Sequence, residues 1–95
     1  MSDQATCELL SEDFRSKVWH WSFESGQETG MHVHEYDYIA IPISGGDFIA
    51  TMDSGEVLEF TQIAGTPYQR LAGVHHNVRF VGVGSASFVE VEFLS

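Results

Sequence analysis

The amino-acid sequence predicts an all-β protein, and three observations lead to that fold class. Short segments with alternating polar and apolar residues follow one another, separated by glycine-containing turns. No segment of ten or more residues combines a helical period with capping residues. The composition, 43% hydrophobic and 19% charged over 95 residues, is typical of a packed globule. Many short strands punctuated by glycine indicate a sandwich or barrel, here in a single domain over residues 1–95.

The expected strands follow in chain order. Residues 1–13 form an N-terminal strand or extension, and Lys17 to Phe23 places Trp19, Trp21 and Phe23 on one face of a strand. The cluster Asp53-Ser54-Gly55 predicts the turn of a hairpin. The other expected strands are 31–34, 36–43, 47–52, 56–63, 67–71, 75–81 and 87–94.

Three histidines are the most informative residues. His32 and His34 form an H-x-H pair, and side chains two apart on a strand point to the same face. Two neutral imidazoles side by side provide half of a transition-metal site. His76, from a later strand, would complete a three-nitrogen face that leaves coordination positions open for a substrate.

The spacing around the first two histidines carries a family resemblance. From Gly26 the chain continues with five residues, His32, one residue, His34, three residues, Tyr38, six residues and Gly45. This pattern resembles the first motif of the cupin superfamily, G-x5-H-x-H-x3-E-x6-G, with Tyr38 in the position that usually holds Glu.

A second stretch resembles the second cupin motif, G-x5-P-x-G-x2-H-x3-N. Gly65 is followed at the motif spacings by Leu71, Gly73, His76 and Phe80, so that Leu71 takes the Pro position and Phe80 the Asn position. The resemblance implies a double-stranded β-helix, the jelly-roll barrel of cupins, with a central pocket and a homodimeric assembly. The motif glycines are expected to form turns with positive φ.

Strand parity supports the same set of ligands. His76 shares parity with the apolar Val78 and Phe80, whereas His75 alternates with polar residues and is expected at the surface. Tyr38 shares parity with the two histidines of the first motif and is expected to face the same interior, provided that the strand continues without a bulge.

Because Tyr38 takes the Glu position of the motif, the sequence does not say which group completes the coordination of the metal beside the three histidines. A phenol with a pKa near ~10 is a poor metal ligand. The three histidines plus water would then hold the metal, or Asp37 or Glu35 would supply a carboxylate through a local bulge. As a pocket residue, Tyr38 would orient a bound oxygen or a substrate carbonyl, or its ring would simply pack in the barrel. Metal identity is not readable, because three imidazoles accept Fe, Ni, Zn, Mn, Co or Cu.

Two function classes follow from this site. A three-histidine centre resembles the non-haem iron cupins that cleave small molecules with dioxygen, so one hypothesis is a dioxygenase-type metalloenzyme acting on a small organic acid. Arg70 is one of four basic residues and would clamp the substrate carboxylate, or form a surface salt bridge. The alternative is a non-catalytic small-molecule-binding cupin without redox chemistry. A weaker third option is an isomerase or lyase that uses the metal as a Lewis acid.

Charge and length exclude other partners. Four Lys and Arg against 14 Asp and Glu give a net charge of −10, which disfavours nucleic acid and anionic membranes. No apolar run approaches the ~20 residues of a membrane span, and the N-terminus has no signal-peptide pattern. The single cysteine, Cys7, cannot form an internal disulfide, so we expect the protein to reside in a reducing cytoplasm. We expect Cys7 itself to be buried as a small hydrophobic residue.

The large apolar residues of two strands suggest a homodimer. Trp19, Trp21 and Phe23, together with Val89, Val91 and Phe93, offer more apolar surface than one small barrel is expected to bury. The aromatic stripe is expected to be core or dimer surface rather than a ligand platform.

Overall fold

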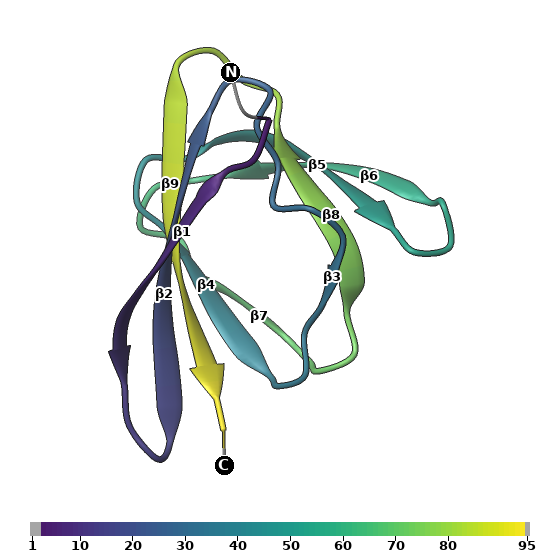
Figure 1. Cartoon of the computed structure of the whole chain (residues 1–95). Coiled ribbons are helices and arrows are strands. Elements are labelled where there is room, and N and C mark those ends of the chain that lie inside the picture. Colours follow the sequence, from purple (N-terminus) through teal and green to yellow (C-terminus); the bar gives the residue numbers. More distant parts are fainter. Residues whose placement is uncertain (1–2, 95) are drawn as a thin grey trace.

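The computed structural model describes residues 3–94, which contain nine strands and no helix (Figure 1). Residues 1, 2 and 95, at the two ends of the expected domain, lie outside this range. None of the described residues forms a helix that is long and apolar enough to cross a membrane. The strands are β1 (Thr6–Glu12), β2 (Ser16–Glu24), β3 (His32–Val33), β4 (Tyr38–Pro42), β5 (Gly46–Met52), β6 (Val57–Gln62), β7 (Tyr68–Arg70), β8 (His75–Phe80) and β9 (Ser85–Phe93).

The strands form two antiparallel sheets that face each other across the interior. One sheet has five strands in the order β1-β2-β9-β4-β7, and the other has four in the order β3-β8-β5-β6. Figure 1 shows β2 and β9 on one side of the interior, with β3 and β8 on the other. The all-β prediction is confirmed, and the extension at 1–13 contains an edge strand, β1.

The apolar core lies at one end of this interior. Phe23, Phe48, Phe80 and Phe88 are each no more than 2% exposed, and the ring centroids of Phe48 and its neighbours Phe23 and Phe80 are 5.3 Å apart. These rings come from four strands of both sheets, so that their burial holds the sheets together. Following β8 from Phe80 back to His76, the inward side chains change from apolar to polar.

Glycines allow the tight connections between these strands. All four glycines of the motifs (Gly26, Gly45, Gly65 and Gly73) have positive φ, as expected. At Gly45 a Cβ would also lie 2.9 Å from the backbone oxygen of Gln62. That contact is too close for any side chain, so this turn requires glycine for two reasons.

The large apolar residues of β2 and β9 are divided between the two faces of the five-stranded sheet. Phe23 is buried in the core and Trp21 packs against it. The outer face carries Val89 and Val91 instead, next to Ile39 and Ile41 of β4. The aromatic stripe therefore faces the interior, and Val89, Val91 and the exposed Phe93 remain on the outer face.

Cys7 is exposed, which contradicts the expectation of a buried residue. It lies on β1, the edge strand of the five-stranded sheet, where every residue is exposed. An edge strand has one neighbour only, so its side chains are covered from one side at most.

Candidate metal centre

The three predicted ligands meet in the interior between the two sheets. His32 on β3 is the direct register partner of His76 on β8. His34 follows β3 and is held by two backbone hydrogen bonds to the loop before β8, from its own N–H to the Val74 oxygen and from the Gly73 N–H to its oxygen, each 2.8 Å long. The inward parity of the H-x-H pair and of His76 therefore brings all three imidazoles together.

The distances between the imidazole nitrogens fit a metal ion. The Nε2 atom of His34 lies 3.0 Å from Nε2 of His32 and 3.3 Å from Nε2 of His76, and all three donor atoms lie within 4.8 Å of one another. Two nitrogens about 2.1 Å from a metal are about 3.0 Å apart at a right angle and about 3.4 Å apart at the tetrahedral angle. The first two separations match adjacent coordination positions of one transition metal, whereas His32 and His76, whose donor atoms lie within 4.8 Å, share it when this distance is about 4.2 Å or less.

The other ring nitrogen of His32 is fixed by its surroundings. Nδ1 lies 2.8 Å from the backbone oxygen of Gly30 and 3.2 Å from Oγ1 of Thr29. A carbonyl can only accept, so Nδ1 carries the proton and Nε2 keeps its lone pair. Such outer contacts orient metal-binding histidines and fix their tautomer.

The surroundings of His34 and His76 keep these two histidines neutral, which is the form that binds metal. Burial lowers the pKa of His34 to about 3, with a further contribution from His32 and His76. The pKa of His76 falls to about 4, mainly through burial and also through His32, His75 and Arg70. Both imidazoles are therefore neutral at pH 7 and need release no proton before they bind a cation.

Tyr38 lies beside the histidines although it belongs to the opposite sheet. The chain leaves β3 and enters β4, so the strand does not continue, yet Tyr38 is buried with its ring centroid 4.0 Å from that of His34. Burial, followed by the charge of Glu90, raises the pKa of its hydroxyl far above the usual value. The phenol therefore keeps its proton and is not suited to be an anionic ligand.

Neither carboxylate considered for the coordination joins the cluster. Asp37 is exposed, and its Oδ1 accepts a hydrogen bond from the Ala72 N–H at 2.7 Å. Glu35 is exposed as well. His75 also stays outside the cluster and lies 3.4 Å from a carboxylate oxygen of Asp53. The three histidines form the only such ligand group within residues 3–94.

A cavity of about 370 Å³ adjoins the cluster and is called the tyrosine cavity here; His76, Tyr38, Tyr68, Arg70, Phe88 and Glu90 are among its lining residues. The guanidinium carbon of Arg70 lies 4.7 Å from the ring centroid of Tyr68, and the Tyr68 hydroxyl accepts a hydrogen bond from Gln62 at 2.9 Å. Arg70 is exposed and forms no ion pair with a described residue, so the expectation of a surface salt bridge is wrong.

A second cavity, of about 220 Å³, also reaches the histidines. It is called the tryptophan cavity here, and it is lined by Cys7, Trp19, Trp21, Glu90 and Glu92 together with His32, His34, Thr29 and Val33. Partial desolvation raises the pKa of the Cys7 thiol to about 11, assisted by the charges of Glu90 and Glu92. The thiol is therefore protonated at neutral pH.

Glu90 lines both cavities and is the residue that sequence reasoning missed. Its side chain is 9% exposed, and burial, followed by the charge of Glu92, raises its pKa to about 7, whereas the Trp21 indole N–H acts in the opposite direction. Its parity with Ala86 and Phe88, which are apolar and buried, was the available signal.

Comparisons with known proteins agree with this description. No protein-family model matches the sequence. The β-alanine degradation protein BauB of Pseudomonas aeruginosa is 37% identical over 75 residues, which cover 79% of this chain and 78% of the relative.

Solved structures resemble the whole chain. A cupin domain from Bordetella pertussis Tohama I is 32% identical, with a TM-score of 0.92, over 97% of this chain and 95% of the other. A cupin superfamily protein from Desulfitobacterium hafniense DCB-2 is 15% identical, with a TM-score of 0.72, over 100% of this chain and 82% of the other, which shows the shared fold.

The fold and the histidine cluster thus define a small β-barrel with a candidate metal centre inside. The chain belongs to the cupin superfamily, and its two sheets are those of the cupin double-stranded β-helix.

Proposed function

We propose that this protein is a metal-dependent cupin that binds a small organic acid beside one divalent transition metal held by His32, His34 and His76. The observation that carries the proposal is the convergence of three imidazole Nε2 atoms at separations of 3.0 and 3.3 Å between neighbours. The group accepts Fe, Ni, Zn, Mn, Co or Cu. Bound iron would supply the redox chemistry of an oxygenase, and within residues 3–94 no carboxylate belongs to the ligand group.

The groups at the walls of the tyrosine cavity support this cavity as the binding site of the acid. Arg70 is the one Lys or Arg among its lining residues, and a guanidinium binds a carboxylate through two parallel hydrogen bonds. Its ring contact with Tyr68 holds it in place. The protonated hydroxyl of Tyr38 would donate a hydrogen bond to an oxygen of the ligand.

The name of a relative supports a proposal for the substrate class. The name of BauB connects that protein with the degradation of β-alanine, a small amino acid. We therefore place the ligand of this chain among small amino acids and the acids derived from them.

The first experiment is elemental analysis of untagged protein, beside the triple variant His32→Ala, His34→Ala, His76→Ala. About one equivalent of metal in the parent and none in the folded variant is the expected result. Absence of metal in the parent, even after anaerobic reconstitution, would overturn the metal centre. An oxygen-electrode assay of the iron-loaded protein with small carboxylic acids then separates catalysis from binding alone.

Arg70→Gln tests the carboxylate contact separately. It should raise the KM or Kd for the acid about tenfold or more and leave the metal content unchanged, because a charge-assisted hydrogen bond is lost. Arg15→Gln is the matched control, since Arg15 is an exposed residue next to the β1–β2 turn. Equal effects of the two changes would exclude a specific clamp at Arg70.

A further inference from the structure

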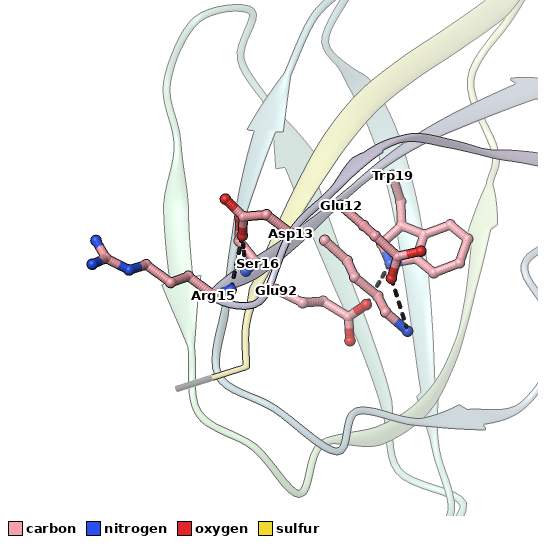
Figure 2. A network of polar contacts seen from close by, with 7 residues as sticks. Glu12, Asp13, Arg15, Ser16, Trp19 and Glu92 are labelled. Atoms are coloured by element: carbon pink, nitrogen blue, oxygen red, sulfur yellow. Dashed lines mark hydrogen bonds and ion pairs between the residues drawn. The ribbon is translucent and has the colours of Figure 1, made fainter.

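The two carboxylates of the tryptophan cavity are held in place by the two indoles. Trp19 is the register partner of Glu90, and Trp21 is that of Phe88. Each indole therefore reaches the residue two positions further along β9, so that Trp19 donates its N–H to Glu92 and Trp21 directs its N–H at Glu90. Figure 2 shows the pair Trp19 and Glu92 joined across adjacent strands. Such regular diagonal contacts fix the direction of both carboxylates.

A positive charge is missing from this arrangement. Within residues 3–94 the ion pairs are Lys17 with Glu12 at 3.9 Å and His75 with Asp53, so neither Glu90 nor Glu92 has a Lys or Arg partner. Lys17 is the register partner of Glu92, yet its Nζ lies against Glu12. Two carboxylates in an aromatic cavity, one of them nine-tenths buried, are costly unless a proton or a cation accompanies them.

We propose that the tryptophan cavity binds a primary ammonium group, the cationic end of a small amine or amino acid. An ammonium has three N–H donors, and two of them can be donated to the two carboxylate oxygens that the single N–H of each indole leaves free. The aromatic walls formed by Trp19 and Trp21 favour a cation further. The two carboxylates repel an anion, so the negative end of a ligand is directed away from this cavity.

The opposite end of such a ligand has its own charge partner. Tyr38 on β4 is the register partner of both Arg70 on β7 and Glu92 on β9. The strand that carries Arg70 therefore lies two strand spacings, about 10 Å, from the strand that carries the carboxylates. The inference rests on the proposed small-molecule function of this barrel and extends it to the recognition of a zwitterion, with the carboxylate at Arg70 and the ammonium at Glu90 and Glu92.

The two tryptophans provide the assay, because they are the only ones in the chain and both line the cavity. Metal-free protein is titrated with n-propylammonium at pH 8, and 1-propanol and propionate serve as neutral and anionic probes of similar size. At this pH Glu90 is ionised, since its pKa is about 7, and an alkylammonium keeps its proton up to about pH 10. A saturable change in intrinsic fluorescence with n-propylammonium alone is expected.

Variants assign the binding to the carboxylates. Glu90→Gln should weaken the binding of n-propylammonium about tenfold or more, and Glu92→Gln should weaken it several-fold, because a charge-assisted contact is lost in each. Glu56→Gln removes the same charge from an exposed residue before β6 and should bind like the parent. Glu92→Gln provides the test even if the substitution of the more deeply buried Glu90 prevents folding.

Parallel measurements of zinc binding distinguish a failure of the proposed ammonium site from a failure of the proposed metal centre. Zinc binding is measured in parallel on the same proteins, and it should be retained in Glu90→Gln and Glu92→Gln. Retained zinc binding with no saturable response to n-propylammonium overturns the ammonium site and leaves the proposed metal centre intact. An equal response to 1-propanol, or equal affinity in all three variants, overturns the inference as well.

Discussion

His32 and His76 occupy a single register position across β3 and β8, so a backbone ladder, not a loop, sets the distance between these two candidate ligands. The third ligand, His34, is held next to them by its own pair of backbone hydrogen bonds. The backbone contacts of the four-stranded sheet and of the loop before β8 therefore bring the three histidines together.

Substitution of the most buried histidine should remove metal binding. His34→Ala takes away the Nε2 atom that is adjacent to both other donors, and we expect zinc affinity to fall by about 100-fold or more, in line with the loss of one of three imidazole ligands. Isothermal titration with zinc measures the change. His75→Ala, which removes a histidine outside the cluster, should leave the affinity unchanged, and a similar loss in both would contradict the assignment of ligands.

Removal of the Tyr38 hydroxyl should not affect metal binding. The phenol keeps its proton and its ring stacks on His34, so Tyr38→Phe preserves the contact and removes an oxygen that is not a ligand. Zinc affinity should stay within about twofold of the parent, since no coordinate bond is lost. A large drop in affinity would show that the tyrosine oxygen binds the metal after all.

Glu90 should make stability depend on pH in a definite direction. Its pKa is raised from 4.5 to about 7 in the folded protein, so the folded state binds the proton more tightly and the free energy of unfolding falls as pH rises from about 4.5 to 7. Above pH 7 the loss is complete, at up to about 3 kcal/mol.

Glu90→Gln should remove this loss. The difference in stability between the variant and the parent should grow in favour of the variant from pH 4.5 to pH 8, because all other titrating groups are common to both proteins. Urea unfolding of both proteins in EDTA at a series of pH values gives the difference. A difference that does not change with pH would contradict the raised pKa.

The outer face of the five-stranded sheet should mediate a homodimer. Val91 lies between Val18 and Ile39 in register, so that apolar side chains from three strands form one continuous surface. Val91→Lys would place a charge at its centre and should convert a dimer into a monomer of half the mass by light scattering with size exclusion. Val83→Lys, at a residue that is 99% exposed in a loop, should leave the assembly unchanged. A parent protein that elutes as a monomer would contradict the prediction.

The phenylalanine cluster should provide much of the folding stability. Phe48 contacts the rings of Phe23, Phe60, Phe80 and Phe88 and is 1% exposed. Phe48→Ala should lower the free energy of unfolding by about 3–5 kcal/mol, because it leaves a cavity between the sheets. Phe14→Ala, at a side chain that is 78% exposed, should change it by less than about 0.5 kcal/mol. Urea titration of both variants checks the contrast.

The sequence predicted the fold and the meeting of the three histidines, because both depend on local patterns. Alternation along each strand fixed the inward faces, and the spacing of the H-x-H pair needed only the period of two. Glu90 and Trp21 also share inward parity with apolar residues, but their proximity depends on the pairing of β2 with β9 in one particular register. That register results from the closure of the whole sheet, and no single segment of the sequence encodes it.

The expectation for Cys7 failed because of neighbours that parity does not identify. Cysteine is usually a buried residue type, but Cys7 lies on an edge strand, where only one side is covered. Trp19 and Val89 lie on neighbouring strands and face opposite sides of the same sheet. Parity assigns two faces to each strand, and only the assembled sheets decide which of them is the interior.

The separation of apolar and polar side chains along the barrel has a consequence for redesign. Along β9 the inward residues run from Ala86 and Phe88 to Glu90 and Glu92, and along β8 they run from Phe80 to His76. The apolar half of the barrel holds the two sheets together, and the polar half contains the candidate metal centre. New ligand specificities should therefore be obtainable by exchanging side chains around Glu90 and Arg70, with little loss of the ability to fold, as long as the phenylalanine half is left untouched.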